Sequence, residues 1–294
     1  MLAGEYGVIV GGSALAIPFD KFSTWPVAVK GTKSKQKEDM ERSSKSLQKI
    51  FSFMEMLPVE QFNARLNKNL FAEQLCEIWY DSNIPDGYGI GSSGALTACL
   101  YHQYFENTNQ LTLEQQRADL GLIESYYHGK SSGVDALTCF QKTPLYFKED
   151  GSIEKLDLDM AKLPMGYRFF LLDSHVRYET GPLVEFFRMR MKDDGFKALI
   201  MEEYLPMNQK LIESLIGIRD ANPGLLFRLI SDFQYTHFRK MIPDSMLDNW
   251  IDGQVGNEFY LKLNGSGGGY MMGLCHYTAK DSMERRFGED LLWV

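Results

Sequence analysis

The chain has 294 residues, of which 44% are hydrophobic and 24% are charged, a composition typical of one or two globular domains rather than a disordered or fibrous chain. The net charge of −8 is spread along the sequence, which argues against a nucleic-acid partner and against an anionic membrane surface, because phosphate neutralisation requires clustered lysines and arginines. A small anionic ligand needs only a local patch and is not excluded.

The cysteines and the N-terminus indicate the cellular compartment. The four cysteines are widely separated and form no C-x-x-C pair, which favours reduced thiols over a disulfide scaffold or a zinc ribbon. No apolar run approaches the ~18 residues that a membrane helix needs. The first residues lack a basic stretch and include Glu5, so they make a poor signal peptide. We therefore expect a cytoplasmic protein without a membrane partner.

The first half of the chain predicts a mixture of strands and helices. Small and β-branched residues over 6–17 predict strand, turn, strand. Residues 34–57 predict a helix that ends before Pro58, because its apolar residues fall on one stripe: Leu47, Ile50, Phe51, Met54 and Leu57. A strand is expected within 75–85 and a helix over 92–105. Thr112 and Gln115 form a capping-box pattern, which predicts a helix over 113–128.

The second half continues this mixture. Asp150 and Gly151 predict a hairpin, and residues 167–174 form a nearly continuous apolar run that predicts a buried strand. The stretch from 180 to about 242 is predicted to be mostly helical, with an interruption near 222–224, and residues 258–277 predict two strands around a glycine-rich turn. Strands and helices do not alternate regularly, which indicates an α+β fold with a boundary near 155–170.

The glycine-rich segment "IPDGYGIGSSGAL" (84–96) allows a flexible loop, a dinucleotide fingerprint or another phosphate cradle. It directly precedes a predicted helix, where free backbone N–H groups attract anions. No lysine follows Gly91, so the Walker pattern is absent, and Glu114, at the spacing of the Rossmann acidic residue, falls in a predicted helix rather than at a strand end. These points favour a cradle for phosphates, formed by Gly87, Gly89, Gly91, Ser92 and Ser93.

Three further segments accompany this loop, and the ordered set resembles the GHMP kinase superfamily. They are "AGEYGVIVGG" at the start, "HGKSSGVDAL" (128–137) and "LNGSGGGYMMG" (263–273). The central family motif P-x-G-x-G-L-G-S-S-A is matched over 85–94, with Ile90 for Leu and Gly94 for Ala. The motif K-L-x-G-A-G-G-G is matched over 262–269, with Ser266 for Ala, and G-E-[HY]-A-V is matched over 4–8, with Gly7 for Ala.

Within the superfamily, "IESYYHGKSSGVD" is similar to the H-G-x-[PS]-S-G-x-D signature of the mevalonate kinases. That resemblance implies Mg²⁺ binding by Glu124 with Ser93, and action of Asp135 on the substrate hydroxyl. The "GEY" form of the first motif is closer to phosphomevalonate kinases. The acceptor hydroxyl is therefore expected on mevalonate, with phosphomevalonate, another small alcohol or a sugar as alternatives.

The resemblance also implies a fold, a cofactor and a substrate side. ATP would lie on the glycine loop, and the substrate would meet Glu5, Tyr6, Ser174, Gly267 and Gly268. The implied α+β fold has an N-terminal domain similar to ribosomal protein S5 over 1–163 and a ferredoxin-like C-terminal domain over 164–294. The implied partner is a small hydroxylated molecule, and a homodimer is left open.

One family feature is missing from the sequence. The family has a lysine a few residues before the Gly-Glu pair, whereas here Met1 stands only three residues before Gly4. Either the natural chain begins further upstream or the protein lacks this phosphate-stabilising cation. The second alternative allows a different class of protein, a non-catalytic nucleotide-binding homologue.

Overall fold

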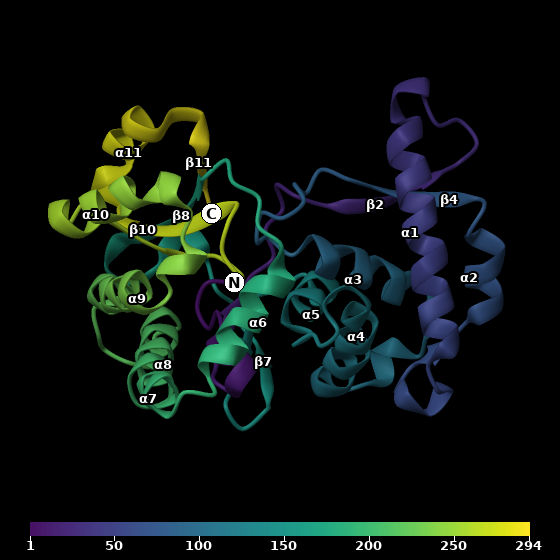
Figure 1. Cartoon of the computed structure of the whole chain (residues 1–294), viewed down its shortest axis with the longest axis horizontal. Coiled ribbons are helices and arrows are strands. Elements are labelled where there is room, and N and C mark those ends of the chain that lie inside the picture. The colour runs from purple at the N-terminus through teal and green to yellow at the C-terminus, as the bar shows by residue number, and fades with distance from the viewer. The chain divides into compact units, whose positions relative to one another are not determined.

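The computed structural model describes the backbone of all 294 residues and the side chains of all except Val59 and His128. The chain divides into two compact units that interleave in sequence (Figure 1). Unit 1 comprises Met1–Ile17, Asp86–Ile90 and Pro144–Val294, and unit 2 comprises Pro18–Pro85 and Gly91–Thr143. Because the units interleave, the linear division after residue 163 stays a prediction.

A four-stranded antiparallel sheet forms the centre of unit 1. Its strand order is β11 (Leu291–Trp293), β8 (Tyr167–Asp173), β10 (Tyr270–His276) and β9 (Phe259–Leu263). Met271 of β10 lies opposite Leu172 of β8 on one side and Leu263 of β9 on the other. The predicted buried strand and the predicted strand pair around the glycine-rich turn are confirmed.

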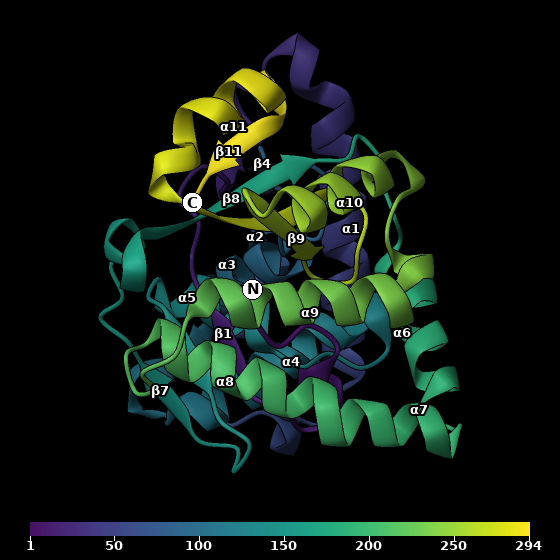
Figure 2. The same cartoon turned by 90° about the vertical axis from the view of Figure 1, so that its left-hand side faces the viewer.

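The helices of unit 1 follow the sheet strand β8 along the chain. Asn222 ends the interruption between α8 (Leu205–Leu215) and α9 (Pro223–His237). Its Oδ1 accepts hydrogen bonds from the backbone N–H groups of Gly224 and Leu225, and Pro223 takes the first helical position. Helices α8 and α9 run side by side (Figure 2), and α9 packs on β9. The helical prediction for 180–242 is confirmed. The helices are α6 (Thr180–Arg190), α7 (Asp194–Leu199), α8 (Leu205–Leu215), α9 (Pro223–His237), α10 (Leu247–Gly256) and α11 (Lys280–Phe287).

A second sheet of unit 1 has the order β1 (Ala14–Ala16), β6 (Leu145–Phe147), β7 (Ile153–Lys155). Strands β6 and β7 form the predicted hairpin. The first strand predicted within 6–17 is wrong, because Gly7–Val10 form a 3-10 helix. Tyr6 has a φ of 61° and Gly11 a φ of 88°, and these left-handed residues turn the chain at both ends of the segment.

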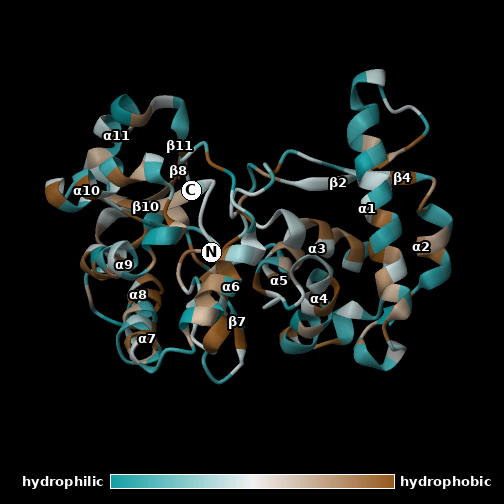
Figure 3. Ribbon diagram, viewed as in Figure 1, coloured by the Kyte–Doolittle hydropathy of each residue, from teal (hydrophilic) through white to brown (hydrophobic). Residues whose placement is uncertain are grey.

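Unit 2 is mainly helical, with two short antiparallel strand pairs. Along α1 (Lys37–Met56), the predicted apolar stripe is confirmed, since Leu47, Ile50 and Met54 are buried. Figure 3 shows hydrophobic and hydrophilic residues alternating along this helix. The capping box of α4 is also confirmed. The elements are α1 (Lys37–Met56), α2 (Lys68–Gln74), α3 (Ser92–Tyr104), α4 (Leu113–His128), α5 (Val134–Gln141), the pair β2 (Thr24–Ala28) and β4 (Ile78–Ser82), and the pair β3 (Arg65–Leu66) and β5 (Phe105–Glu106).

A buried carboxylate links the helices of unit 2 to the segment before β3. Asp119 of α4 is completely buried and accepts hydrogen bonds from the Tyr101 hydroxyl at 2.9 Å and from the backbone N–H groups of Asn63 and Ala64 at 2.7 and 2.9 Å. These donors satisfy the charge that burial would otherwise destabilise.

Among the helices that the structure describes, none combines the length and the apolar character of a membrane span.

Candidate functional site

The glycine loop passes from unit 1 into unit 2 between Ile90 and Gly91, where α3 begins. Gly91 precedes the helix with a φ of 76°, a left-handed conformation that glycine adopts without steric cost. Ser92 and Ser93 are the first two helical residues. The predicted helix that opens from the loop is thus confirmed, with two hydroxyl groups at its N-terminus.

Glu124 of α4 lies beside this N-terminus. The hydroxyl of Ser93 donates a hydrogen bond to Oε1 of Glu124 at 2.9 Å, and the hydroxyl of Ser131 donates one to Oε2. The residue is only 5% exposed. Burial, followed by the charge of Asp135, raises the pKa of Glu124 to about 7. Ser131, in the second Ser-Ser-Gly turn, was missed as a site residue.

Asp135 stands in the first turn of α5, after Gly133 with a φ of 69°. A Cβ atom added at Gly91 would lie 3.4 Å from the Cβ of Asp135, so the loop before α3 runs against this residue. Since α3 and α5 pack against each other, Asp135 lies next to the N-terminal ends of both helices. Helix N-termini carry unpaired N–H groups and a positive partial charge, which attract anions.

The chemistry of these groups fits a magnesium ion. Glu124 and Ser93 offer oxygen ligands, which Mg²⁺ prefers, and a cation would relieve the repulsion between Glu124 and Asp135 that contributes to the raised pKa. Among the side chains described, no group of three or more His, Cys, Asp or Glu is arranged for a metal. A metal at Glu124 would therefore take further oxygen ligands from water or from a phosphate.

In unit 1, the first part of the glycine loop is held by close backbone contacts. The carbonyl of Gly87 accepts a hydrogen bond from the backbone N–H of Tyr178 at 3.3 Å, and the carbonyl of Tyr88 accepts one from the backbone N–H of Tyr270 at 3.2 Å. A Cβ atom at Gly89 would lie 2.4 Å from the carbonyl oxygen of Asn264. Only glycine allows this approach, so the glycine here has a packing role besides the predicted phosphate contact.

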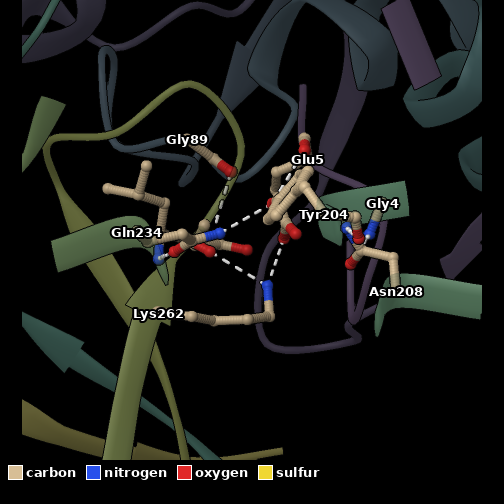
Figure 4. A network of polar contacts seen from close by, with 9 residues as sticks. Gly4, Glu5, Gly89, Tyr204, Asn208, Gln234 and Lys262 are labelled. Carbon is tan, nitrogen blue, oxygen red and sulfur yellow. Dashed lines mark hydrogen bonds and ion pairs between the residues drawn. The ribbon is translucent and has the colours of Figure 1, made fainter. Parts of the chain in front are cut away.

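The predicted substrate-side residues Glu5 and Tyr6 are both buried in unit 1. Glu5 forms an ion pair with Lys262, and its carbonyl accepts a hydrogen bond from the Tyr204 hydroxyl at 3.0 Å (Figure 4). The Tyr6 hydroxyl donates to the carbonyl of Ser266. Lys262 was present in a matched motif, but its pairing with Glu5 was missed, because 257 residues separate the two.

Ser174, Gly267 and Gly268 also belong to one neighbourhood in unit 1. Ser174 is 3% exposed, its N–H donates to the carbonyl of Gly269 at 2.9 Å, and its hydroxyl accepts from the N–H of Val176 at 3.2 Å. Gly267 and Gly268 have φ angles of 105° and 72°. The predicted site residues thus form two groups, Gly91, Ser92, Ser93, Glu124 and Asp135 in unit 2, and Glu5, Tyr6, Gly87, Gly89, Ser174, Gly267 and Gly268 in unit 1.

Gly94 permits the close packing of α3 on α5. A Cβ atom at this position would lie 2.9 Å from the backbone nitrogen of Ala136 and 3.0 Å from the Cβ of Asp135. We expect Gly94→Ala to destabilise the protein by about 1–3 kcal/mol, because the start of α5 must move. Urea unfolding measures this loss. In the matched control Gly121→Ala, within α4, the nearest atoms are 3.5 Å away, and equal destabilisation by both changes would contradict the prediction.

Comparisons with known proteins give one family model and several solved structures. Residues 59–142, which include α3, α4, α5 and the cluster around Glu124, match the model of the GHMP kinases N terminal domain. No curated protein matches the sequence. The resemblance to the GHMP kinase superfamily is therefore present in sequence in the segment that holds Ser93, Glu124 and Asp135.

The fold is similar to those of solved mevalonate and phosphomevalonate kinases over nearly the whole chain. The structure of L. major mevalonate kinase in complex with R-mevalonate matches with a TM-score of 0.62 and 15% identity, covering 99% of this chain and 91% of that one. Methanococcus jannaschii mevalonate kinase gives 0.60 and 17%, covering 100% and 93%. Streptococcus pneumoniae phosphomevalonate kinase, in complex with phosphomevalonate and AMPPNP, gives 0.60 and 12%, covering 100% and 97%. The α+β fold expected from the sequence is thus confirmed, and it is the fold of these mevalonate and phosphomevalonate kinases.

Proposed function

We propose that this protein is an ATP- and Mg²⁺-dependent kinase that transfers the γ-phosphate of ATP to a hydroxyl group of a small molecule, with mevalonate as the first candidate. The observation that carries the proposal is the cluster in unit 2, where the hydroxyl of Ser93 and the carboxylates of Glu124 and Asp135 lie at the N-termini of α3 and α5. Phosphoryl transfer requires positioning and charge neutralisation, and these groups supply both.

Each residue has a separate task in the proposed reaction. The glycine loop and the backbone N–H groups at the start of α3 bind the ATP phosphates. Ser93 and Glu124 would hold Mg²⁺, whose charge offsets the negative charge of the phosphates. Asp135 orients the acceptor hydroxyl and accepts its proton as the oxygen attacks phosphorus. Glu5, Tyr6, Ser174, Gly267 and Gly268 are proposed for the substrate side.

Other acceptors and another class of function follow from particular features. The tyrosine of the "GEY" segment favours phosphomevalonate as an alternative acceptor, and the phosphomevalonate kinase of Streptococcus pneumoniae shares the fold. A non-catalytic nucleotide-binding homologue is the second candidate function, because it would use the same helix N-termini to bind phosphates without transferring one. All four cysteines are free of disulfide bonds, in keeping with the cytoplasmic location that we propose.

An ADP-release assay tests the proposal. The purified protein is mixed with ATP, Mg²⁺ and one acceptor at a time, from mevalonate, phosphomevalonate, homoserine and common sugars. We expect ADP release that depends on mevalonate, with a phosphorylated product of matching mass. ADP release with a sugar alone would exclude the mevalonate assignment. ATP binding without ADP release for any acceptor would indicate the non-catalytic alternative.

A further inference from the structure

A completely buried ion pair joins two sequence motifs of unit 1. Both side chains, Lys262 at the C-terminal end of β9 and Glu5 near the N-terminus, have 0% exposure. The Lys262 ammonium donates to Oε1 of Glu5 and, at 2.9 Å, to the carbonyl of Leu263 (Figure 4). Burial lowers the pKa of Lys262, and the charge of Glu5 opposes this shift.

The polar network around this pair extends to the glycine loop. Asn264, two residues after Lys262, donates from Nδ2 to the carbonyl of Gly89 at 3.0 Å. A Cβ atom at Gly265 would lie 2.8 Å from that same carbonyl oxygen, so the two glycine-rich segments touch through their backbones. Through Lys262 and Asn264, the N-terminal segment, the turn after β9 and the loop at Gly89 are therefore joined within unit 1.

Tyr204, directly before α8, and Gln234 of α9 hold the network through further hydrogen bonds. The Tyr204 hydroxyl donates to the carbonyl of Glu5 at 3.0 Å and accepts from Nε2 of Gln234 at 2.9 Å. Gln234 in turn accepts, through Oε1, the N–H of Leu263 at 2.7 Å. The contacts close a ring from Glu5 through Tyr204, Gln234 and Leu263 to Lys262 and back to Glu5, so the orientation of the pair is defined on several sides.

Stability alone gives no reason for a charged pair here. Removing two charges from water is costly, and apolar residues of similar volume are often as stabilising at such a place. The neighbours of Lys262 on β9, Leu261 and Leu263, are apolar and completely buried. Oε2 of Glu5 and Oδ1 of Asn264 are buried without a hydrogen-bond partner among the described residues, which adds a further cost. Both observations favour a role for the pair in orienting the segments that it joins.

We propose that Lys262 is a positioning residue, which acts through Glu5 and the Leu263 carbonyl to hold the N-terminal Gly4-Glu5-Tyr6 segment and the turn at Asn264 against the glycine loop at Gly89. The proposal rests on the proposed kinase function, because these segments carry the substrate-side and phosphate-side residues assigned above. Lys262 itself is buried and contacts neither substrate nor nucleotide in this role.

The double variant Glu5→Leu/Lys262→Met tests the proposal, because it removes both charges together and leaves no buried unpaired ion. We expect it to melt within a few degrees of the wild type. We expect hydrogen–deuterium exchange of peptides covering 2–10 and 87–90 to rise by about tenfold, because these segments lose their fixed contact. With the acceptor found for the wild type, kcat should fall by about tenfold or more, and the KM for ATP should change by less than about threefold.

The control variant Glu154→Leu/Lys148→Met removes a solvent-exposed ion pair of the same unit, with a separation of 2.8 Å, and should change neither exchange nor kcat. Any one of three results with the variant Glu5→Leu/Lys262→Met would overturn the proposal. These are wild-type exchange in both segments, an unchanged kcat, and failure of the variant to fold. If the wild type transfers phosphate to no acceptor, the kinase assignment fails, and the exchange of the two segments alone then decides the role of Lys262.

Discussion

Replacing Asp135 by asparagine is expected to lower kcat by about 10²- to 10⁴-fold while the affinity for ATP stays within a few-fold. The amide keeps the size and the hydrogen-bonding reach of the side chain but accepts no proton from the attacking hydroxyl. The first turn of α5 is retained, because Gly133 rather than Asp135 occupies the N-cap position. Steady-state kinetics with the acceptor found for the wild type, together with ATP titration, measures both quantities.

A helix N-terminal charge elsewhere in unit 2 provides the matched control. Asp39 stands in the first turn of α1, is exposed, and pairs with Arg42 at 2.9 Å. Asp39→Asn should leave kcat unchanged and cost less than about 1 kcal/mol of stability, the usual size of a charge–dipole interaction. Turnover by Asp135→Asn at the wild-type rate would show that Asp135 only stabilises the helix, as Asp39 does.

Replacing Glu124 by glutamine is expected to abolish magnesium-dependent turnover and, without divalent cations, to stabilise the protein by about 1–3 kcal/mol at pH 8. The pKa of Glu124 is about 7 in the folded state, against 4.5 as its ordinary value. The folded protein therefore holds the proton more tightly than the unfolded chain. The stability that this proton contributes is fully present below about pH 4.5 and is lost as the pH rises through about 7. Glutamine removes this loss.

Urea unfolding of both proteins between pH 5 and pH 8 measures the effect. The wild type should lose stability relative to Glu124→Gln over this interval, and added Mg²⁺ should stabilise the wild type but not the variant. Glu55→Gln, at an exposed position of α1, is the control and should follow the wild type at each pH. Parallel stability curves for the wild type and Glu124→Gln would refute the raised pKa.

Elements governed by neighbouring residues could be predicted from the sequence. The capping box at Thr112 and Gln115, the apolar stripe of α1 and the hairpin at Asp150 all depend on side chains a few positions apart. The first predicted strand failed for a different reason. The segment after Tyr6 has residues typical of a strand, but Tyr6 itself has a left-handed conformation. Tertiary hydrogen bonds hold it there: the Tyr6 hydroxyl donates to the Ser266 carbonyl, and the Tyr204 hydroxyl donates to the carbonyl of the preceding residue, Glu5.

The candidate site shows the same difference between local patterns and tertiary contacts. Ser93, Glu124 and Asp135 were predicted as a group from the resemblance of their segments to GHMP kinase motifs, and the family model matches the sequence over these residues. Spacing did not predict that the Ser131 hydroxyl completes the contacts of Glu124. It also did not predict the burial that raises the pKa of this carboxylate, because burial depends on the packing of α3, α4 and α5.

By itself, the sequence predicted most of the helices and strands and carried the resemblance to a kinase superfamily, because these depend on short patterns and their order. Only the tertiary structure decided that Lys262 meets Glu5 across 257 residues and that their pair lies out of water. Such a contact has no local pattern. It exists because β9, α9 and Tyr204, directly before α8, meet at the N-terminal segment, and the low-polarity surroundings make each buried charge depend on its partner.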